Sequence, residues 1–213
     1  MGSEISTESA PLHSPKTPIV VLGPGYSLPY RIRIEAQAQD PSDKKTCNIL
    51  EFRDESGDLL FALQNISLDD RKPLVDTQGQ QIGYLQPTSS LYDEYTIFRS
   101  KKEPVCIIEK TGISRPQFRL EIKATKGTPT RKLYALADDL RTLLVCDGKL
   151  KNGGQPIFRI TRLNEGLTHN QGKYSIDIMP NVDIAMAACL ASIYHFKIYS
   201  MLSPGPVAWA FGS

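Results

Sequence analysis

The stretch VDIAMAACLASIYHFKIYS, residues 182–200, decides the fold of this chain. Residues 184–194 carry no charge, while Asp183 stands before them and His195 and Lys197 stand after them. A helix that is apolar on all sides must be surrounded by protein or by lipid, and a bilayer span needs about 20 residues. We therefore expect a helix buried inside the protein, with a membrane span as the alternative.

Nearly everything before this helix predicts short strands separated by turns. The segments expected to be strands are 30–34, 47–52, 59–64, 73–75, 81–85, 94–99, 105–110, 118–123, 132–137, 142–147, 156–162 and 174–179. Eleven or twelve short strands of this kind are typical of an all-β sandwich or barrel. A closed barrel has no free edge, and a larger one has an interior to fill. The alanine-rich helix is thin enough to fill it.

Alternation along the strands predicts which side chains face the core. In 118–123 we expect the apolar residues to face inward and Arg119, Glu121 and Lys123 to face outward. Residues 36–45 are polar and predict a connector. Asn181 or Asp183 is placed to cap the start of the helix.

The chain divides into three parts. Residues 1–28 are rich in Ser, Thr and Pro, and we expect a mobile leader that docks through the apolar patch at 19–22. Residues 29–202 form a single domain, and 203–213 form a tail that contains the only tryptophan, Trp209. The sequence leaves open whether this tail packs on the barrel or on a partner.

Composition favours an intracellular protein. Four scattered cysteines without a CxxC pair predict free thiols. The N-terminus lacks the apolar region of a secretory signal, so we expect no secretion. The start of the chain fits the loose myristoylation pattern, so acylation of Gly2 stays open. The net charge is only +2, which gives no general case for nucleic-acid binding. We expect a cytoplasmic location, with peripheral attachment to a membrane left open.

The charge is unevenly distributed along the chain. Residues 35–70 hold nine acids and three bases, a net charge of −6, whereas residues 99–162 hold fifteen bases and six acids, a net charge of +9. This asymmetry would give a dipolar surface with one basic face. The alternative is that strands of opposite charge pair across the sheet.

Three segments then resemble the LURP-one-related family. FRDESGDLLF at 52–61 is similar to its F-D-x-x-G-x-L-x-F segment, LVDTQGQQI at 74–82 to its L-x-D-x-x-G-x-x-L, and NVDIAMA at 181–187 to its G-x-D-x-A-x-A. The resemblance covers roughly residues 47–200. It implies the tubby-like fold that tubby-like proteins and phospholipid scramblases share, a twelve-stranded antiparallel β-barrel enclosing a central hydrophobic C-terminal helix. The stretch 169–173 lacks the clustered carboxylates of scramblases, so calcium binding and lipid scrambling are not implied.

No pattern in the sequence predicts a catalytic or metal site. None of the histidines His13, His169 and His195 has a cysteine or histidine at metal-ligand spacing, and His195 is expected to be a core or rim residue. The chain has no nucleophile elbow and no P-loop. We therefore expect a non-enzymatic protein without catalytic residues, metal or cofactor.

One run of cations remains as a candidate site. Seven bases and only two acids lie between residues 109 and 132, and some of the bases flank one expected turn, so they would converge at a corner of the barrel. The residues are Lys110, Arg115, Arg119, Lys123, Lys126, Arg131 and Lys132. Several cations near an anionic membrane gain about 1 kcal/mol each, and tubby relatives bind phosphoinositides, so the resemblance implies a lipid head-group site.

The sequence therefore predicts a phosphoinositide, another anionic lipid or a protein as partner, bound by a monomeric barrel without nucleic acid. One alternative is ordinary solubilising charge on exposed hairpins. Another is a barrel that encloses a small hydrophobic ligand or handles lipid in the manner of a scramblase.

Overall fold

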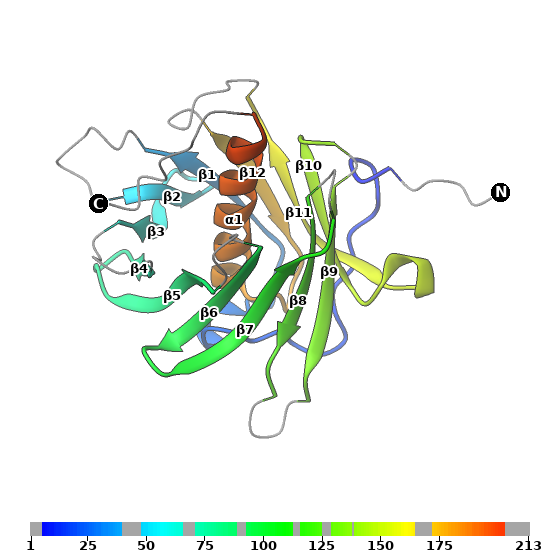
Figure 1. Ribbon diagram of the computed structural model, residues 1–213, viewed down its shortest axis with the longest axis horizontal. Coiled ribbons are helices and arrows are strands. Elements are labelled where there is room, and N and C mark those ends of the chain that lie inside the picture. Colours follow the sequence, from blue (N-terminus) through cyan, green and yellow to red (C-terminus); the bar gives the residue numbers. More distant parts are fainter. Residues whose placement is uncertain are drawn as a thin grey trace.

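The computed structural model describes residues 6–39, 48–65, 71–88, 93–112, 116–124, 129–137, 139–164 and 172–202. Its elements are twelve strands, two short 3-10 helices and one α-helix (Figure 1). The strands are β1 (Ile32–Ala38), β2 (Asn48–Asp54), β3 (Leu59–Gln64), β4 (Lys72–Asp76), β5 (Gln81–Pro87), β6 (Glu94–Ser100), β7 (Glu103–Lys110), β8 (Gln117–Ile122), β9 (Arg131–Ala137), β10 (Thr142–Asp147), β11 (Gln155–Arg162) and β12 (Lys173–Ile178). The helices are η1 (Pro24–Tyr26), η2 (Leu150–Asn152) and α1 (Ile184–Leu202).

The twelve strands close into one antiparallel barrel. Each strand pairs with its neighbours in the sequence, and β1 pairs with both β2 and β12 to complete the ring. Closure of this kind leaves no strand edge open to another chain. The predicted fold class, a twelve-stranded antiparallel barrel around a C-terminal helix, is confirmed.

Residues alternate between the barrel interior and the outside. In β8 the buried residues are Phe118, Leu120 and Ile122, while Arg119 is exposed and Glu121 is half-buried. β12 follows the same pattern, with Tyr174, Ile176 and Ile178 buried. The inward faces of the strands and the helix form one large hydrophobic core cluster.

The helix α1 runs through the barrel and fills its interior (Figure 1). Every residue from Val182 to Ile198 is buried. The small side chains Ala185, Ala187, Ala188 and Ala191 lie in this core. The helix is long and apolar enough to cross a membrane, but 83% of the residues from Ile184 to Met201 are buried inside the barrel. Its apolar surface is therefore covered by protein, as the sequence predicted.

Asp183 caps the start of the helix. Its carboxylate is fully buried and accepts a hydrogen bond from the Met186 N–H at 2.9 Å. It also accepts the N–H groups of Val21 at 2.7 Å and Leu22 at 2.8 Å. Of the two capping candidates, Asp183 therefore takes the role, and Asn181 adopts a positive φ of 68° just before it.

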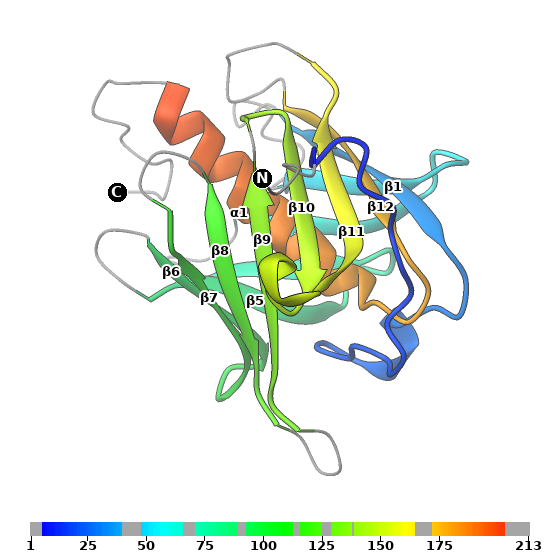
Figure 2. The same ribbon diagram turned by 90° about the vertical axis from the view of Figure 1, so that its right-hand side faces the viewer.

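Residues 6–28, named here the strap, run along the outside of the barrel and then across one of its ends (Figure 2). The Arg159 guanidinium donates to the Thr7 carbonyl at 2.9 Å, and the His13 N–H donates to the Pro156 carbonyl at 2.6 Å. Further along, Ile19 pairs with Val182. The docking patch predicted at 19–22 is in place, because Ile19, Val21 and Leu22 are buried. Mobility of the leader stays a prediction.

The first strand was predicted at residues 30–34 but lies at Ile32–Ala38. β1 runs to Ala38, so residues 36–38 are strand and the prediction of a connector there was wrong. Ala36 and Ala38 face the core between polar neighbours, and their small side chains hid the alternation. The tail 203–213 with Trp209 lies outside the described residues.

Candidate functional site

The predicted cluster of seven cations is only partly drawn together. Arg115 and Lys126 lie outside the described residues. Lys110, at the end of β7, lies 3.6 Å from the carboxylate of Asp93. Arg119, on β8, forms an ion pair with Glu109 on the neighbouring strand. These two cations are therefore matched by acids next to them in the sheet.

The other three members lie at the end of the barrel where α1 begins, named here the entry end. Lys123 follows β8 and is exposed, and its N–H donates to the Val105 carbonyl at 3.0 Å. Arg131 and Lys132 open β9 across the same hairpin. Lys132 is 3.6 Å from the carboxylate of Glu121. Only this part of the predicted corner exists as a group.

Arg131 joins the hairpin to two other parts of the chain. Its Nε donates to Asp147 Oδ1 at 3.0 Å, and its Nη2 binds the second carboxylate oxygen. Its Nη1 donates to the carbonyl and the hydroxyl of Thr17, at 2.9 and 3.2 Å. Arg131 is therefore held between β10 and the strap rather than exposed as a free cation.

Antiparallel pairing brings further lysines to the entry end. The β6–β7 turn, the end of β8 and the link between β10 and β11 all lie there because β6 to β11 are consecutive neighbours in the ring. Five lysines on these turns are exposed, and in the described part of the chain none has a carboxylate within 4 Å. We name them the lysine rim: Lys101, Lys102, Lys123, Lys149 and Lys151.

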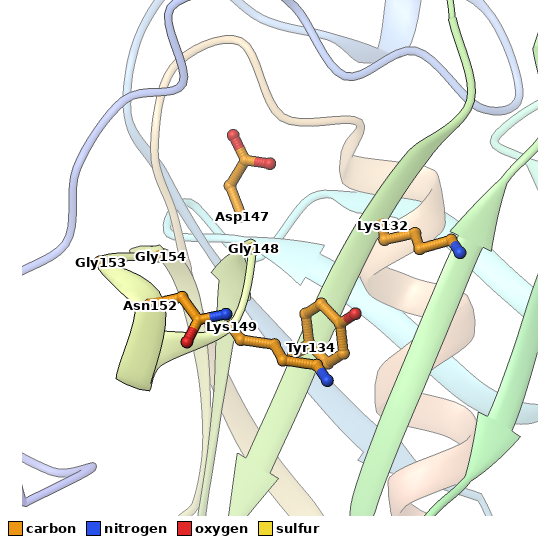
Figure 3. Close-up of a pocket in the computed structure, with 8 residues that line it drawn as sticks. All are labelled: Lys132, Tyr134, Asp147, Gly148, Lys149, Asn152, Gly153 and Gly154. Carbon is orange, nitrogen blue, oxygen red and sulfur yellow. The ribbon is translucent and has the colours of Figure 1, made fainter.

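A shallow hollow of about 500 Å³ lies beside this rim (Figure 3). Its lining, named here the Tyr134 hollow, consists of Lys132, Tyr134, Asp147, Gly148, Lys149, Asn152, Gly153 and Gly154. Lys149 Nζ lies 5.4 Å from the centre of the Tyr134 ring, within cation–π range. In Figure 3 Asn152 lies to one side of that ring and Lys132 to the other, and the Lys149 side chain runs from the Asn152 side to the ring.

Glycine is required where the link between β10 and β11 forms one wall of the hollow. Gly148 and Gly153 both have a φ of 82°, which a residue with a side chain rarely adopts. A Cβ on Gly154 would lie 2.3 Å from the Gly148 carbonyl oxygen. The tight fold of this link leaves the hollow open and holds Lys149 over the ring.

The opposite side of the entry end is acidic. The β2–β3 turn carries Asp54, Glu55 and Asp58, and the β4–β5 turn begins at Asp76. Asp54 and Asp76 accept backbone N–H groups of their own turns. The uneven charge of the sequence thus becomes a dipole across one end of the barrel. Pairing across the sheet, the second reading, also occurs, as Arg119 with Glu109 illustrates.

The nucleophilic and titratable groups of the core are poorly placed for chemistry. Burial raises the pKa of the Cys106 and Cys189 thiols well above the usual range, and raises that of Cys146 to about 11. His195 is buried, and its Nδ1 lies 2.9 Å from the Tyr174 hydroxyl. Among the described residues, no three His, Cys, Asp or Glu side chains gather as a metal site would require.

Sequence reasoning missed four of the five rim lysines. Lys101 and Lys102 stand before the predicted run, and Lys149 and Lys151 stand after it. The count of fifteen bases between residues 99 and 162 included them, but they meet only through the order of strands in the barrel.

Comparison with known proteins bears on the fold. The family model described as LURP-one-related matches residues 42–195. No curated protein matches the chain. The X-ray structure of a protein from Arabidopsis thaliana is similar, with a TM-score of 0.60 and 21% sequence identity over 84% of this chain and 98% of that one. At this identity the likeness concerns the fold alone.

Proposed function

Since the chain belongs to the LURP-one-related family, with its tubby-like barrel around a buried helix, we propose that it is a non-enzymatic protein that binds an anionic lipid head group. The binding surface is the lysine rim with the adjoining Tyr134 hollow, and a phosphoinositide is the favoured ligand. The protein then attaches peripherally to the cytoplasmic face of a membrane.

One observation carries this proposal: five exposed lysines, with no carboxylate within 4 Å among the residues that the structure describes, gather at one end of the barrel. Elsewhere the described outward-facing cations are largely paired, as Lys173 is with Glu35 at 2.9 Å. Unpaired cations near an anionic surface each gain about 1 kcal/mol. The acidic side of the entry end would be repelled by the same surface, so the barrel should lie tilted with its lysines toward the lipid.

The Tyr134 hollow suits a phosphate-bearing head group. Lys132 and Lys149 offer ammonium groups and the Asn152 side chain offers an amide, while the Asp147 carboxylate in the same lining is engaged by Arg131. Ammonium groups and amides donate to phosphate oxygens. The volume of about 500 Å³ lies within the range of small-molecule sites.

The barrel interior does not support the alternative of an enclosed hydrophobic ligand. The helix α1 already occupies the interior, with residues such as Met186, Leu190 and Tyr194 fully buried. A ligand there would have to displace the helix from the core.

The test is co-sedimentation of the full chain with vesicles of phosphatidylcholine, with and without a phosphoinositide, at low and at physiological salt. The triple variant K123A/K149A/K151A should bind roughly 100-fold more weakly, at about 1 kcal/mol for each lost cation. The matched control is R31A/R53A/K173A, which removes the same charge from paired cations away from the rim and should change affinity little.

Equal losses in the two triple variants would mean that only net charge matters, and the site would be wrong. If the unmodified chain binds neither vesicle at either salt concentration, the lipid proposal fails. A protein partner would then become the better explanation of the rim.

A further inference from the structure

The strap carries two hydroxyl residues that each precede a proline, Ser14 before Pro15 and Thr17 before Pro18. Both hydroxyl residues are exposed, and neither belongs to a helix or strand. A residue before proline is biased toward an extended backbone. An exposed hydroxyl on an extended segment before proline is the substrate form that proline-directed protein kinases accept.

The two hydroxyl residues differ in what faces them. Thr17 accepts two hydrogen bonds from Arg131 Nη1, one at its hydroxyl and one at its carbonyl. The same guanidinium pairs on its other side with Asp147, which lines the Tyr134 hollow. Within the described part of the chain the Ser14 side chain makes no hydrogen bond, so Ser14 is a control within the same segment.

We propose that Thr17 is a phosphorylation site for a proline-directed kinase, and that the phosphate pairs with Arg131, tightens the strap and weakens anion binding at the lysine rim. The last effect rests on the proposed function. In the modification the Thr17 oxygen bonds to the γ-phosphorus of ATP, the bond from that phosphorus to the ADP oxygen breaks, and the hydroxyl proton leaves to the kinase base.

Electrostatics gives the direction of both effects. A phosphate carries a charge of about −1.5 to −2 at pH 7 and offers three strong acceptor oxygens, which suit a guanidinium better than a hydroxyl does. The strap beyond Thr17 is anchored by the N–H groups of Val21 and Leu22 on Asp183, so a firmer hold at Thr17 protects these amides. The added charge also cancels most of the +2 of the chain, next to the hollow.

The first experiment treats the full chain with a proline-directed kinase and ATP, and locates the phosphate by mass spectrometry. A synthetic peptide of residues 10–22 serves as the reference substrate. We expect modification of Thr17 in the S14A variant and its loss in the P18A variant. If the peptide is modified at Thr17 and the folded chain is not, the proposal is wrong.

The second experiment compares two singly phosphorylated proteins, phospho-Thr17 made in S14A and phospho-Ser14 made in T17A. We expect amide hydrogen exchange at residues 19–22 to slow several-fold in the first protein and to stay unchanged in the second. The slowing should vanish in R131Q. Equal exchange in the two phosphoproteins would overturn the pairing with Arg131.

Vesicle binding then separates this inference from the proposed function. Phospho-Thr17 should bind phosphoinositide vesicles about tenfold more weakly than the unmodified chain, and phospho-Ser14 should lose less. If the unmodified chain binds no vesicle while phospho-Thr17 still protects the strap, the proposed function and the regulatory effect fail and the modification site stands. If vesicles bind but phosphorylation has no effect on affinity, the regulatory effect alone is overturned.

Discussion

The two ends of the barrel differ in the partners of their carboxylates. At the entry end the buried carboxylate of Asp183 is satisfied by backbone N–H groups of the helix and the strap. At the other end, where α1 leaves the barrel, two lysines share one carboxylate. Lys197 lies 3.3 Å and Lys110 lies 3.6 Å from Asp93.

This difference supports the proposal that the entry end binds an external anion. Backbone N–H groups satisfy its buried carboxylate, so the exposed lysines at this end are left available to solvent or to a ligand. At the exit end, named here for the end where α1 leaves, Lys110 and Lys197 are both engaged by Asp93. Substitutions at each end measure how much stability depends on that end's own arrangement of charged groups.

The largest effect is expected at Asp183. Replacement by alanine would leave the buried N–H groups of Val21, Leu22 and Met186 without an acceptor. Since each unsatisfied buried donor costs about 1–3 kcal/mol, we expect D183A to lower the free energy of unfolding by roughly 3–5 kcal/mol, part of the loss being relieved by hydration of the released strap. Urea unfolding measures the loss.

The matched control is D177A. Asp177 pairs with Arg31 and Arg33, whose side chains are about half exposed, so its loss should cost less than about 1 kcal/mol. Hydrogen exchange should also show the strap released in D183A alone. Similar losses in the two variants would mean that the entry end does not depend on its buried carboxylate.

A smaller effect is expected from crowding at the exit end. A Cβ on Gly172 would lie 2.6 Å from His195 Nδ1 and 3.1 Å from a Tyr174 ring carbon. Both rings are buried and joined by a hydrogen bond, so neither can move freely. We expect G172A to lower the free energy of unfolding by about 1–3 kcal/mol, because overpacking forces strained side chains.

The control for this variant is G25A, where a new Cβ meets nothing within 4 Å. Thermal unfolding should place G25A within about 0.5 kcal/mol of the unmodified chain. A G172A protein as stable as G25A would show that the exit end is loosely packed, and the contrast between the two ends would then lie in charge alone.

Most of the fold could be predicted because burial leaves a local mark. The alternation of Phe118, Leu120 and Ile122 with charged residues fixes the face of β8, and the uncharged run at 184–194 fixes the helix. The end of β1 was missed because Ala36 and Ala38 bury too little apolar surface to stand out in the sequence.

The candidate site could be predicted only in part, because it depends on neighbours across the sheet. Arg119 looks like a free cation in the sequence, and its partner Glu109 is found only from the register of β7 and β8. Lys101 and Lys151 are 50 residues apart in the sequence, and the ring of strands brings them to the same end.

The smallest effect is expected at Lys197, whose side chain is only 8% exposed. Burial, the larger influence, lowers the pKa of Lys197 from its ordinary value of 10.5, and Asp93 partly opposes that shift. Burying a charged pair costs about as much as the pair returns. We therefore expect K197M to change the free energy of unfolding at pH 7 by less than about 1 kcal/mol.

The pH dependence sharpens this prediction. Between the lowered pKa of folded Lys197 and 10.5, the unfolded chain binds more protons at this residue than the folded one does, so the contribution of Lys197 to stability rises with pH. Urea unfolding at pH 7 and pH 10 should show the unmodified chain gaining stability relative to K197M as the pH rises, while its difference from the K173M control stays constant. The buried thiols and tyrosines titrate alike in all three proteins, so their opposite effect cancels in these differences. A loss of several kcal/mol in K197M at pH 7 would instead mean that its pair with Asp93 is strongly stabilising. The stability of the exit end would then depend on an ion pair, whereas that of the entry end depends on the Asp183 carboxylate and the backbone N–H groups that it accepts.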